Sequence, residues 1–489
     1  MDEVNEIFRQ FHQGHGEWKK FINSIKITNI HGWSGQTMEF HYPVVAVVGE
    51  NGIGKSTFLK AAVCAYKNTA GKDFYPSKMF MNTQWDREAL NGALIEYHIR
   101  EGNVERDLKW KRTKEWGFTP KKKKPERYVS FWDISRTLPI DATAGYAKVA
   151  LSNSEVGSDT VLEEESIRGL SFILGQHYTN ARFTKTNVDQ SREVGLLTKS
   201  YGEISQFHQG AGEDSILDLI KALQTIPQQS LLVIDEVENS LHPQAQRRFV
   251  QYLLTLSRKK KIQIILSTHS PFVLEELPPI ARIMLVPLSD QKQIIDSVST
   301  NFALSTIDDH ISHPDLYIHV EDEEAEALVW EILKTHQDRY DEFSKRITIL
   351  DVGSCSVVDT LNDYSQHNKL PYKSVSIVDG DKKTEYPDCL SLPGNRAPEK
   401  MVFEDLKNLE WNNLTERFGM GAGALYKILD DAMLEPDHHF WTEYVGDRVK
   451  KSKDTVWSIL ISEWCKQVYP TLQDTSMIDG IIQSLDSIR

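Results

Sequence analysis

Residues 46–57 read Ala-Val-Val-Gly-Glu-Asn-Gly-Ile-Gly-Lys-Ser-Thr and contain a complete G-x-x-x-x-G-K-S pattern. The apolar run from Val44 to Val48 predicts a strand before the pattern, and Phe58 to Ala65 predicts a helix after it. Glycines in this setting let several backbone N–H groups point at phosphate oxygens, beside the positive end of the helix. The stretch therefore predicts a nucleoside triphosphate site in an α/β fold.

Individual residues of this loop have expected roles. The Lys55 ammonium can reach the outer phosphates, and the Ser56 hydroxyl can bind Mg²⁺. The loop residues that we expect to hold the nucleotide are Gly49, Asn51, Gly52, Gly54, Lys55, Ser56 and Thr57.

A later segment supplies carboxylates and a histidine. Residues 231–236 read L-L-V-I-D-E, which predicts a buried parallel strand followed by two acids. Asp235 can then hold the Mg²⁺ ion and its water shell, and Glu236 can polarise the attacking water. The segment S-T-H-S-P closes the next apolar strand and puts His269 near the terminal phosphate. The combination predicts nucleotide hydrolysis, with Lys55, Glu236 and His269 as catalytic residues.

Composition excludes several classes of protein. The 489 residues suffice for two or three domains, each with its own core. The four cysteines form no C-x-x-C pair and predict neither a disulfide framework nor a zinc site. No apolar run approaches the ~20 residues of a spanning helix, and residues 1–20 lack the apolar core of a secretory signal. We expect a cytoplasmic location and no membrane partner.

The net charge of −14 argues against a uniformly basic surface but leaves room for a local basic groove. Between Arg106 and Arg127 the chain has ten Lys or Arg against three acids, with Trp110, Trp116 and Phe118 interleaved. Two interpretations stay open: a solvated hairpin and loop, or a contact to a nucleic-acid backbone with aromatic side chains for stacking.

Patterning suggests two domains. Alternation over Phe21 to Phe40 and over Ala93 to Trp110 predicts strands and a hairpin, and residues 137–200 read as a loop-rich or helical insertion. A strand–helix–strand alternation over 215–267 predicts a parallel α/β core. The sequence His-Pro-Asp at 313–315 marks a boundary. We expect one domain over 1–312 and a smaller α/β domain with C-terminal helices over 313–489.

The order of the first domain's elements resembles the ATP-binding cassette heads of the structural-maintenance (SMC) and RecF-like ATPases. This resemblance implies ATP as the nucleotide and a homodimer or higher homo-oligomer, in which one subunit completes the site of another. The matching signature segment is Gln-Gly-Ala-Gly-Glu at 209–213, whose Gly210, Gly212 and Glu213 would cap the γ-phosphate from a helix N-terminus. The family has Ser where Gly210 stands, which favours slow turnover or ATP used as a clamp. Gln84 is the candidate glutamine-loop residue.

In the second domain three predicted strands end in acids. Residues 316–321 (L-Y-I-H-V-E) end in Glu321, and 347–351 (I-T-I-L-D) end in Asp351. Residues 375–381 (V-S-I-V-D-G-D) end in the pair Asp379 and Asp381. Carboxylates gathered at one sheet edge suit Mg²⁺ or Mn²⁺, and such ions serve phosphodiester hydrolysis.

These acids resemble those of the toprim domain. A RecF-like ATPase followed by toprim, here from about Phe21 to Trp464, resembles the overcoming-lysogenization-defect (OLD) nucleases, which include the nuclease subunit of the Gabija antiphage system. The resemblance implies that Glu321, Asp379 and Asp381 hold the metal. The chain has Asp322 where the family has Gly, and Ala325 where it has an acid. Further candidates are Glu324, Glu326, Glu399 and Glu404 as ligands and Lys451 or Lys453 as the late lysine.

The expected function is that of an ATP-hydrolysing antiphage protein in which ATP controls Mg²⁺- or Mn²⁺-dependent cleavage of DNA. The alternative is an ATPase sensor or scaffold with a degenerate toprim-like domain that restrains a separate effector protein, as in the Septu and PARIS defence systems. A repair ATPase of the RecF kind is the third reading, and a toprim domain in the same chain argues against it.

Overall fold

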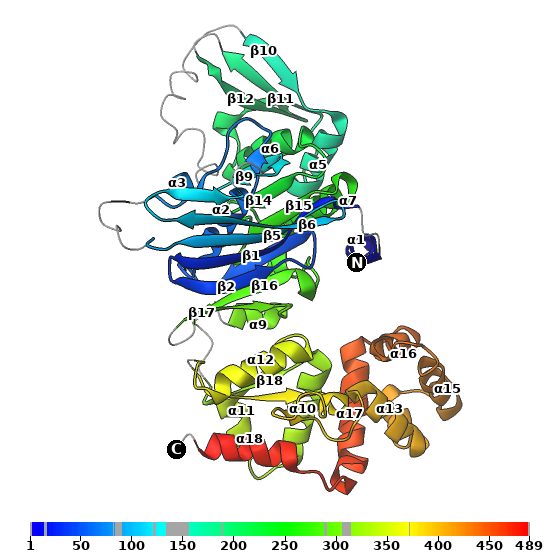
Figure 1. Cartoon of the computed structure of the whole chain (residues 1–489). Coiled ribbons are helices and arrows are strands. Elements are labelled where there is room, and N and C mark those ends of the chain that lie inside the picture. The colour runs from blue at the N-terminus through cyan, green and yellow to red at the C-terminus, as the bar shows by residue number, and fades with distance from the viewer. Residues whose placement is uncertain are drawn as a thin grey trace. The chain divides into compact units, whose positions relative to one another are not determined.

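The computed structural model describes residues 2–13, 17–81, 83, 90–120, 124–133, 156–186, 189–287, 291–305, 314–370 and 372–487. The chain divides into two compact units, the first comprising residues 1–287 and 291–296 and the second residues 288–290 and 297–489 (Figure 1). In the described part of the chain, every helix is too short or too polar to cross a membrane.

The first unit is built on a mixed six-stranded sheet of order β17-β16-β3-β15-β14-β9. The strands β9, β14, β15, β3 and β16 run parallel, and β17 pairs antiparallel with β16. Their bounds are β3 Val44–Gly49, β9 Val129–Trp132, β14 Leu231–Ile234, β15 Gln263–Ser267, β16 Arg282–Pro287 and β17 Lys292–Asp296. Every residue of β3, β14 and β15 is buried, which explains their continuous apolar sequences. The predicted parallel α/β core is confirmed.

Helices pack against this sheet and complete the core. The helix after the phosphate loop, α2, contacts β14, β15 and β9, and α7 contacts β15 and β3. The helices and short elements of this unit that lie outside the insertion are α1 Asp2–Gln13, α2 Lys55–Val63, β4 Lys67–Asn68, α3 Pro76–Met79, β8 Glu126–Arg127, η3 Gln206–His208, α6 Ala211–Gln224, α7 Pro243–Lys260, α8 Pro271–Leu274 and η4 Pro279–Ala281.

A second, antiparallel sheet of order β2-β1-β5-β6-β7 belongs to the same unit. Its strands are β1 Lys20–Ile30, β2 Trp33–Glu39, β5 Leu94–Glu101, β6 Val104–Arg112 and β7 Trp116–Thr119. The predicted hairpin is confirmed as β5–β6, in which Glu101 pairs with Val104. In β5, buried residues alternate with partly exposed ones, as expected for a sheet with one face on the core.

The predicted loop-rich or helical insertion is wrong for the part that the structure describes. Residues 156–205 contain a four-stranded antiparallel sheet with one helix against α6 and α7. The elements are β10 Val156–Val161, α5 Glu164–Leu174, β11 Asn180–Thr186, β12 Asp189–Lys199 and β13 Gly202–Ser205. The strands are rich in Thr, Ser and charged residues, so the apolar alternation that usually reveals a strand is weak here. Residues 137–155 of the insertion lie outside the described residues.

The second unit contains a four-stranded parallel sheet of order β19-β18-β20-β21. The three predicted strands are confirmed as β18 Leu316–Val320, β19 Ile347–Asp351 and β20 Ser374–Val378, and the helices α10 Glu323–Thr335 and α12 Cys355–Gln366 alternate with them along the chain. The other elements are α9 Thr300–Ser305, α11 Tyr340–Arg346, η5 Gly380–Lys382, β21 Leu390–Ser391, α13 Pro398–Asn408, α14 Leu414–Phe418, α15 Ala422–Ala432, η6 His438–Phe440, α16 Trp441–Val449, α17 Lys453–Gln467, η7 Tyr469–Thr471 and α18 Ser476–Asp486.

The expected boundary at residues 312–313 lies outside the described residues, but the passage between the units comes earlier, after Asp296. The Ser299 N–H donates to the Val352 carbonyl at 3.1 Å, and Val298 forms an isolated bridge with Gly353. These bonds hold the segment before β18 on the end of β19, so it packs with the second unit.

Candidate functional site

The phosphate loop of the first unit joins the end of β3 to the start of α2 through a tightly packed turn. Gly54 has φ +113°, and a Cβ at this position would lie 2.6 Å from Nε1 of Trp33. A Cβ at Gly49 would lie 2.6 Å from the Leu285 carbonyl oxygen. Glycine is therefore required at both positions, and the loop backbone lies at the N-terminus of α2, where its amides can meet an anion.

Lys55 begins α2 and is buried. Its Nζ donates to the Gly49 carbonyl at 2.9 Å and to the Glu50 carbonyl at 3.1 Å. Burial lowers the pKa of Lys55, and the negative charges of Asp235, Glu236 and Glu238 act in the opposite direction. The structure thus brings the lysine and the predicted carboxylates into one electrostatic neighbourhood.

Ser267, at the end of β15, orients both predicted carboxylate residues. Because β14 and β15 are parallel and in register, Asp235 and Glu236 follow β14 beside Ser267. The Ser267 hydroxyl donates to Asp235 Oδ1 at 2.5 Å and accepts the Glu236 N–H at 2.8 Å. The Glu236 side chain accepts a hydrogen bond from Asn239 Nδ2 at 2.9 Å. Ser267 and Asn239 were not predicted as site residues, and no sequence signal marks them apart from their places beside the two acids.

His269 lies in the same region and is held by Glu238. The His269 N–H donates to Glu238 Oε1 at 2.6 Å. Burial raises the pKa of Glu238, and burial together with the Lys55 charge lowers the pKa of His269. Neither Glu238 Oε2 nor His269 Nε2 has a hydrogen-bond partner among the described residues, although both atoms are buried. Glu238 is a candidate site residue that sequence reasoning missed.

The signature segment lies at the start of α6, against the loop that follows Glu236. A Cβ at Gly212 would lie 2.5 Å from the Ser240 carbonyl oxygen, whereas a Cβ at Gly210 would meet nothing within 4 Å. Glu213 accepts hydrogen bonds from Tyr178 and from Lys199, the latter at 2.6 Å. Burial alone would raise the pKa of Glu213, but these two bonds hold it below its usual value.

Lys292 on β17 is a further residue that sequence reasoning did not single out. Its Nζ donates to the His31 carbonyl at 2.8 Å and to the Ile53 carbonyl at 2.9 Å. Nδ1 of His31 in turn lies 3.2 Å from the hydroxyl of Thr57 in the phosphate-loop helix. Lys292 therefore ties the β1–β2 turn to the phosphate loop. Gln84, the candidate glutamine-loop residue, lies outside the described residues.

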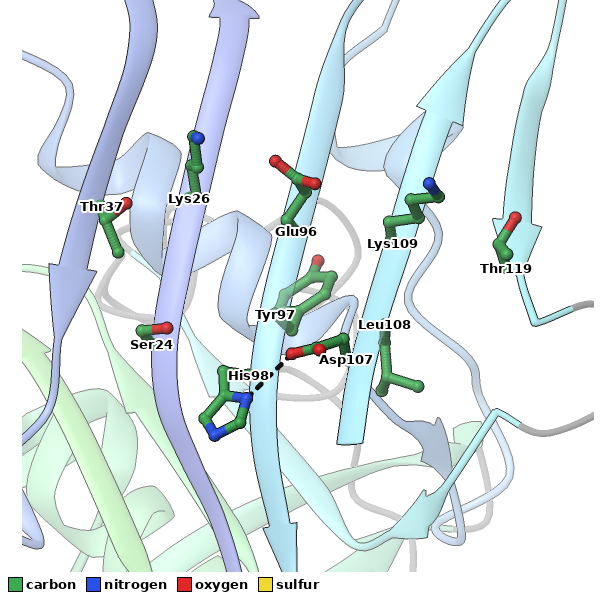
Figure 2. Close-up of a pocket in the computed structure, with 10 residues that line it drawn as sticks. All are labelled: Ser24, Lys26, Thr37, Glu96, Tyr97, His98, Asp107, Leu108, Lys109 and Thr119. Carbon is green, nitrogen blue, oxygen red and sulfur yellow. Dashed lines mark hydrogen bonds and ion pairs between the residues drawn. The ribbon is translucent and has the colours of Figure 1, made fainter. Parts of the chain in front are cut away.

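The solvent-facing side of the antiparallel sheet has a hollow of about 540 Å³ with mixed charge (Figure 2). Figure 2 shows Lys26, Glu96 and Lys109 on three neighbouring strands. His98 bridges two acids, with Nδ1 2.9 Å from Asp107 and Nε2 3.2 Å from Glu105. Because acids and bases alternate from strand to strand, this face is not a continuous basic groove.

The aromatic residues of the basic segment divide between core and surface. Trp110 is buried and its Nε1 donates to the Cys64 carbonyl at 3.0 Å, so this ring is not available for the base stacking that the nucleic-acid interpretation would need. Trp116 is half-buried and lines a hollow of about 410 Å³ with Tyr75, Arg112 and Lys114. Of the four consecutive lysines in this segment, Lys121 to Lys123 lie outside the described residues.

In the second unit the carboxyl ends of the parallel strands bring three predicted acids together. The Asp379 N–H donates to Glu321 Oε1 at 3.1 Å, and the charge of Asp381 acts on both side chains. Burial, followed by the charge of Glu321, raises the pKa of Asp379 to about 9. Asp379 Oδ1 is buried and has no hydrogen-bond partner in the described part of the chain. Such an oxygen is costly unless a cation or a proton meets it, so these acids suit a divalent ion.

Most of the other acidic candidates have partners of their own, although the charges of Asp322 and Glu399 also raise the pKa of Asp379. Asp322 caps α10 by accepting the Ala325 N–H at 2.8 Å, and burial raises its pKa to about 7. Burial and, to a smaller extent, the charge of Asp351 raise the pKa of Glu326 to about 7. Glu326 therefore lies near Asp351, the last residue of β19. Two further ion pairs involve candidate residues: Lys453 lies 3.3 Å from Glu324, and Arg396 lies 2.6 Å from Glu404.

Comparison with known proteins supports an ATPase in the first unit. Residues 140–275 match the family described as "AAA domain, putative AbiEii toxin, Type IV TA system". The match includes the segments with Asp235, Glu236 and His269. Protein ea59 of Escherichia phage lambda is 25% identical over 282 residues, which are 53% of this chain and 48% of that protein. The chain thus spans about half the length of this curated relative.

Solved structures with some likeness are SMC heads. The SMC head domain from Thermotoga maritima is 14% identical, with a TM-score of 0.35 over 56% of this chain and 98% of that one. An SMC head bound to the C-terminal winged-helix domain of ScpA is 13% identical, with a TM-score of 0.39 over 56% of this chain and 97% of that one. The family match, together with the mixed α/β fold, supports an ATPase-type AAA domain in the first unit, and such a domain implies ATP and typically Mg²⁺.

Proposed function

We propose that this chain is an ATP-regulated, metal-dependent DNA nuclease of the OLD type that acts in defence against phages. The observation that carries the nuclease part is the convergence of Glu321, Asp379 and Asp381 at the carboxyl edge of a parallel sheet. The cluster occurs in the same chain as an ATPase domain. Residues 314–370 and 372–487 would form the toprim-like part, and a RecF/SMC-like head would precede it.

In the ATPase unit, each residue has a proposed task that follows from its contacts. Lys55 would exchange its two loop carbonyls for the outer phosphates of ATP. Ser56 and Asp235 would hold Mg²⁺, and the Ser267 hydroxyl fits this role because it fixes the Asp235 carboxylate. Glu236 would accept a proton from the attacking water while Asn239 holds its side chain. A neutral His269 would donate to the terminal phosphate.

In the second unit the acids would hold Mg²⁺ or Mn²⁺. A divalent ion there supplies an activated water and stabilises the leaving oxygen of a phosphodiester. The chain's own contribution is to orient Glu321 through the Asp379 N–H and to gather enough negative charge to attract the ion. The buried, unpartnered Asp379 Oδ1 fits a metal ligand.

The experiment is incubation of the purified chain with plasmid DNA and Mg²⁺ or Mn²⁺, with and without ATP. We expect cleavage by the parent and none by Asp379→Ala/Asp381→Ala, whose ATPase rate should stay near the parent level. Asp388→Asn, at an exposed acid of the same unit, is the matched control and should cleave normally. Lys55→Ala should bind no ATP, and Glu236→Gln should bind ATP without turnover. Cleavage by the double alanine variant at the parent rate would refute the nuclease assignment.

A second candidate function is the sensor or scaffold that restrains a separate effector. The observation in its favour is that Ala325, where the toprim family has an acid, is buried in the apolar core of the second unit. A phage-plating assay separates the two functions. Full protection by Asp379→Ala/Asp381→Ala, with no DNA cleavage by the parent in either metal, would favour the sensor.

Assembly into a homodimer or higher oligomer also belongs to the proposal. If the signature segment acts on a second subunit's nucleotide, ATP should stabilise the assembled state of Glu236→Gln by mass action. We expect a rise in molecular mass on adding ATP. An unchanged mass would count against a composite site.

A further inference from the structure

The second unit contains a cluster of mixed ligands that the proposed nuclease site does not use. Among the residues that the structure describes, Glu399, His438 and His439 form one group whose ligand atoms lie within 4.8 Å of one another. Glu399 stands in the first turn of α13, and the two histidines form the η6 turn some 40 positions later in the chain. The sequence separates Glu399 from the two adjacent histidines, and the fold brings the three together.

The local structure holds these three side chains firmly. The His439 N–H donates to the Asp437 side chain at 3.1 Å, which fixes the η6 turn. Nε1 of Trp441 donates to the Glu435 carbonyl at 3.0 Å and braces the turn from its other end. The rings of His438 and His439 lie 4.1 Å apart, between centroids, and each directs one nitrogen towards Glu399. Nδ1 of His439 lies 2.8 Å from Oε1, and Nε2 of His438 lies 4.0 Å from Oε2.

An ion pair alone accounts for only part of this geometry. His439 and Glu399 are at hydrogen-bond distance, but 4.0 Å is too long for a hydrogen bond from His438. The Glu399 side chain is 2% exposed, so its second oxygen is buried beside an imidazole nitrogen that does not reach it. A cation between Glu399 and the two imidazoles would be within reach of all three groups at once.

The surroundings add negative charge and leave an entry path. The charge of Glu399 acts on both Asp322 and Asp379, so the cluster borders the acid group of the proposed nuclease site. Asp379 is itself more than nine-tenths buried and has an oxygen without a partner among the described residues. The His439 side chain is 57% exposed, so an ion can enter from solvent without opening the fold.

We propose that Glu399, His438 and His439 bind a transition-metal dication of the Zn²⁺ class, separately from the ion held by Glu321, Asp379 and Asp381. Two imidazole nitrogens and one carboxylate favour Zn²⁺ and its neighbours, whereas Mg²⁺ prefers an all-oxygen site. Three protein ligands leave room for water or an anion at a fourth position. The sequence predicted no zinc site because that prediction rested on the spacing of the cysteines, whereas the ligands proposed here are two histidines and a glutamate.

The test is Zn²⁺ binding to the full chain in excess Mg²⁺, which occupies all-oxygen sites. Calorimetry should detect one Zn²⁺ site per chain, and X-ray absorption of the loaded protein should show imidazole coordination. His438→Ala/His439→Ala should weaken binding by about 100-fold or more and remove the imidazole signal. The control His367→Ala, at an exposed histidine of the same unit, should bind like the parent. Asp379→Ala/Asp381→Ala should keep the imidazole signal, with an affinity lowered only by the loss of nearby negative charge.

A folding defect can be separated from loss of a ligand. His438→Ala alone removes no hydrogen bond to Glu399, so its melting temperature without metal should match the parent while Zn²⁺ affinity falls. Zn²⁺ bound with oxygen ligands only, or with unchanged affinity in the double histidine variant, would overturn the proposal. The measurement needs neither ATP nor DNA, so its failure would leave the nuclease proposal standing.

Discussion

Replacement of Gly212 by alanine should damage the ATPase through the loop that carries Ser240. An added methyl group would lie 2.5 Å from the Ser240 carbonyl oxygen, and ordinary contact begins at 3.4 Å. The loop or the helix must therefore move by about 0.9 Å. Ser240 has φ +62° and lies shortly after Asn239, which holds Glu236. The movement would thus be transmitted to the predicted catalytic carboxylate.

Two opposing free energies set the size of the effect on stability. Overpacking of this kind costs about 1–3 kcal/mol, and exchanging Gly for Ala within a helix returns about 1 kcal/mol. The net loss is up to about 2 kcal/mol, or a melting temperature lower by about 2–4 °C per kcal/mol. The catalytic effect should be larger, since a displacement of about 1 Å can cost about 100-fold in rate. We expect kcat to fall by about 10- to 100-fold.

The measurements are thermal melting and steady-state ATP hydrolysis. Gly210→Ala is the matched control for stability, because a Cβ there meets nothing within 4 Å and φ is −66°. It should melt at or above the parent temperature. Adding Ser240→Gly to Gly212→Ala should restore part of the rate, since glycine at a positive φ lets the carbonyl turn away. Parent-like kcat and melting in Gly212→Ala would show that the packing of α6 on this loop is irrelevant.

Three further predictions follow from other contacts. Ser267→Ala removes the donor to Asp235 and the acceptor for the Glu236 N–H. It should lower the free energy of unfolding in urea by about 2–4 kcal/mol and reduce ATP turnover, and an unchanged denaturation midpoint would contradict this. Lys292→Met should weaken ATP binding measured by calorimetry, because the phosphate loop loses the hydrogen bond at the Ile53 carbonyl. The control Lys369→Met, at a lysine paired with Asp363, should leave ATP binding unchanged. Because burial raises the pKa of Asp379 to about 9, its contribution to stability without metal is full below the unfolded value of 3.8 and is lost as pH rises towards about 9. Mn²⁺ must displace that proton, so thermal stabilisation by Mn²⁺ should increase from about pH 6 to about pH 9; a flat profile would place the ion elsewhere.

The sequence predicted best those elements whose residues are buried on both faces. The continuous apolar runs of β3, β14 and β15 allow few other structures, and the same holds for the strand–helix alternation from β18 to β20. The sheet in the insertion was missed because strands such as β12, with charged and hydroxyl side chains, lack a clear apolar period. The sequence left the place of Trp110 open because an aromatic residue among lysines can be exposed or buried, and the β5–β6 pairing turns it towards Cys64.

Residues of the sites were predictable where the chemistry requires a residue type at a fixed spacing. Lys55, Asp235 and Glu236 are of that kind. Ser267 and Lys292 could not be predicted, because any hydrogen-bond donor close enough to the same acceptor atom could take their place. Which donor is close enough depends on tertiary packing. The pairing of Glu399 with His439 has the same origin, since it arises where α13 meets the η6 turn.

The two groups of acids differ in how their charge is balanced, and this difference bears on function. In the first unit a buried lysine, Lys55, faces Asp235, Glu236 and Glu238. In the second unit, burial and mutual repulsion raise the pKa of Asp379 to about 9 and that of Asp322 to about 7. A fold gains no stability from such carboxyl groups, so their gathering is better explained by a bound cation. On the proposed toprim-like reading, Asp322 would add a carboxyl group beside this cluster where that family has glycine, and Ala325 would remove one from the following turn. The two differences would thus move a carboxyl group rather than abolish it, so a metal-binding second unit remains compatible with both of them.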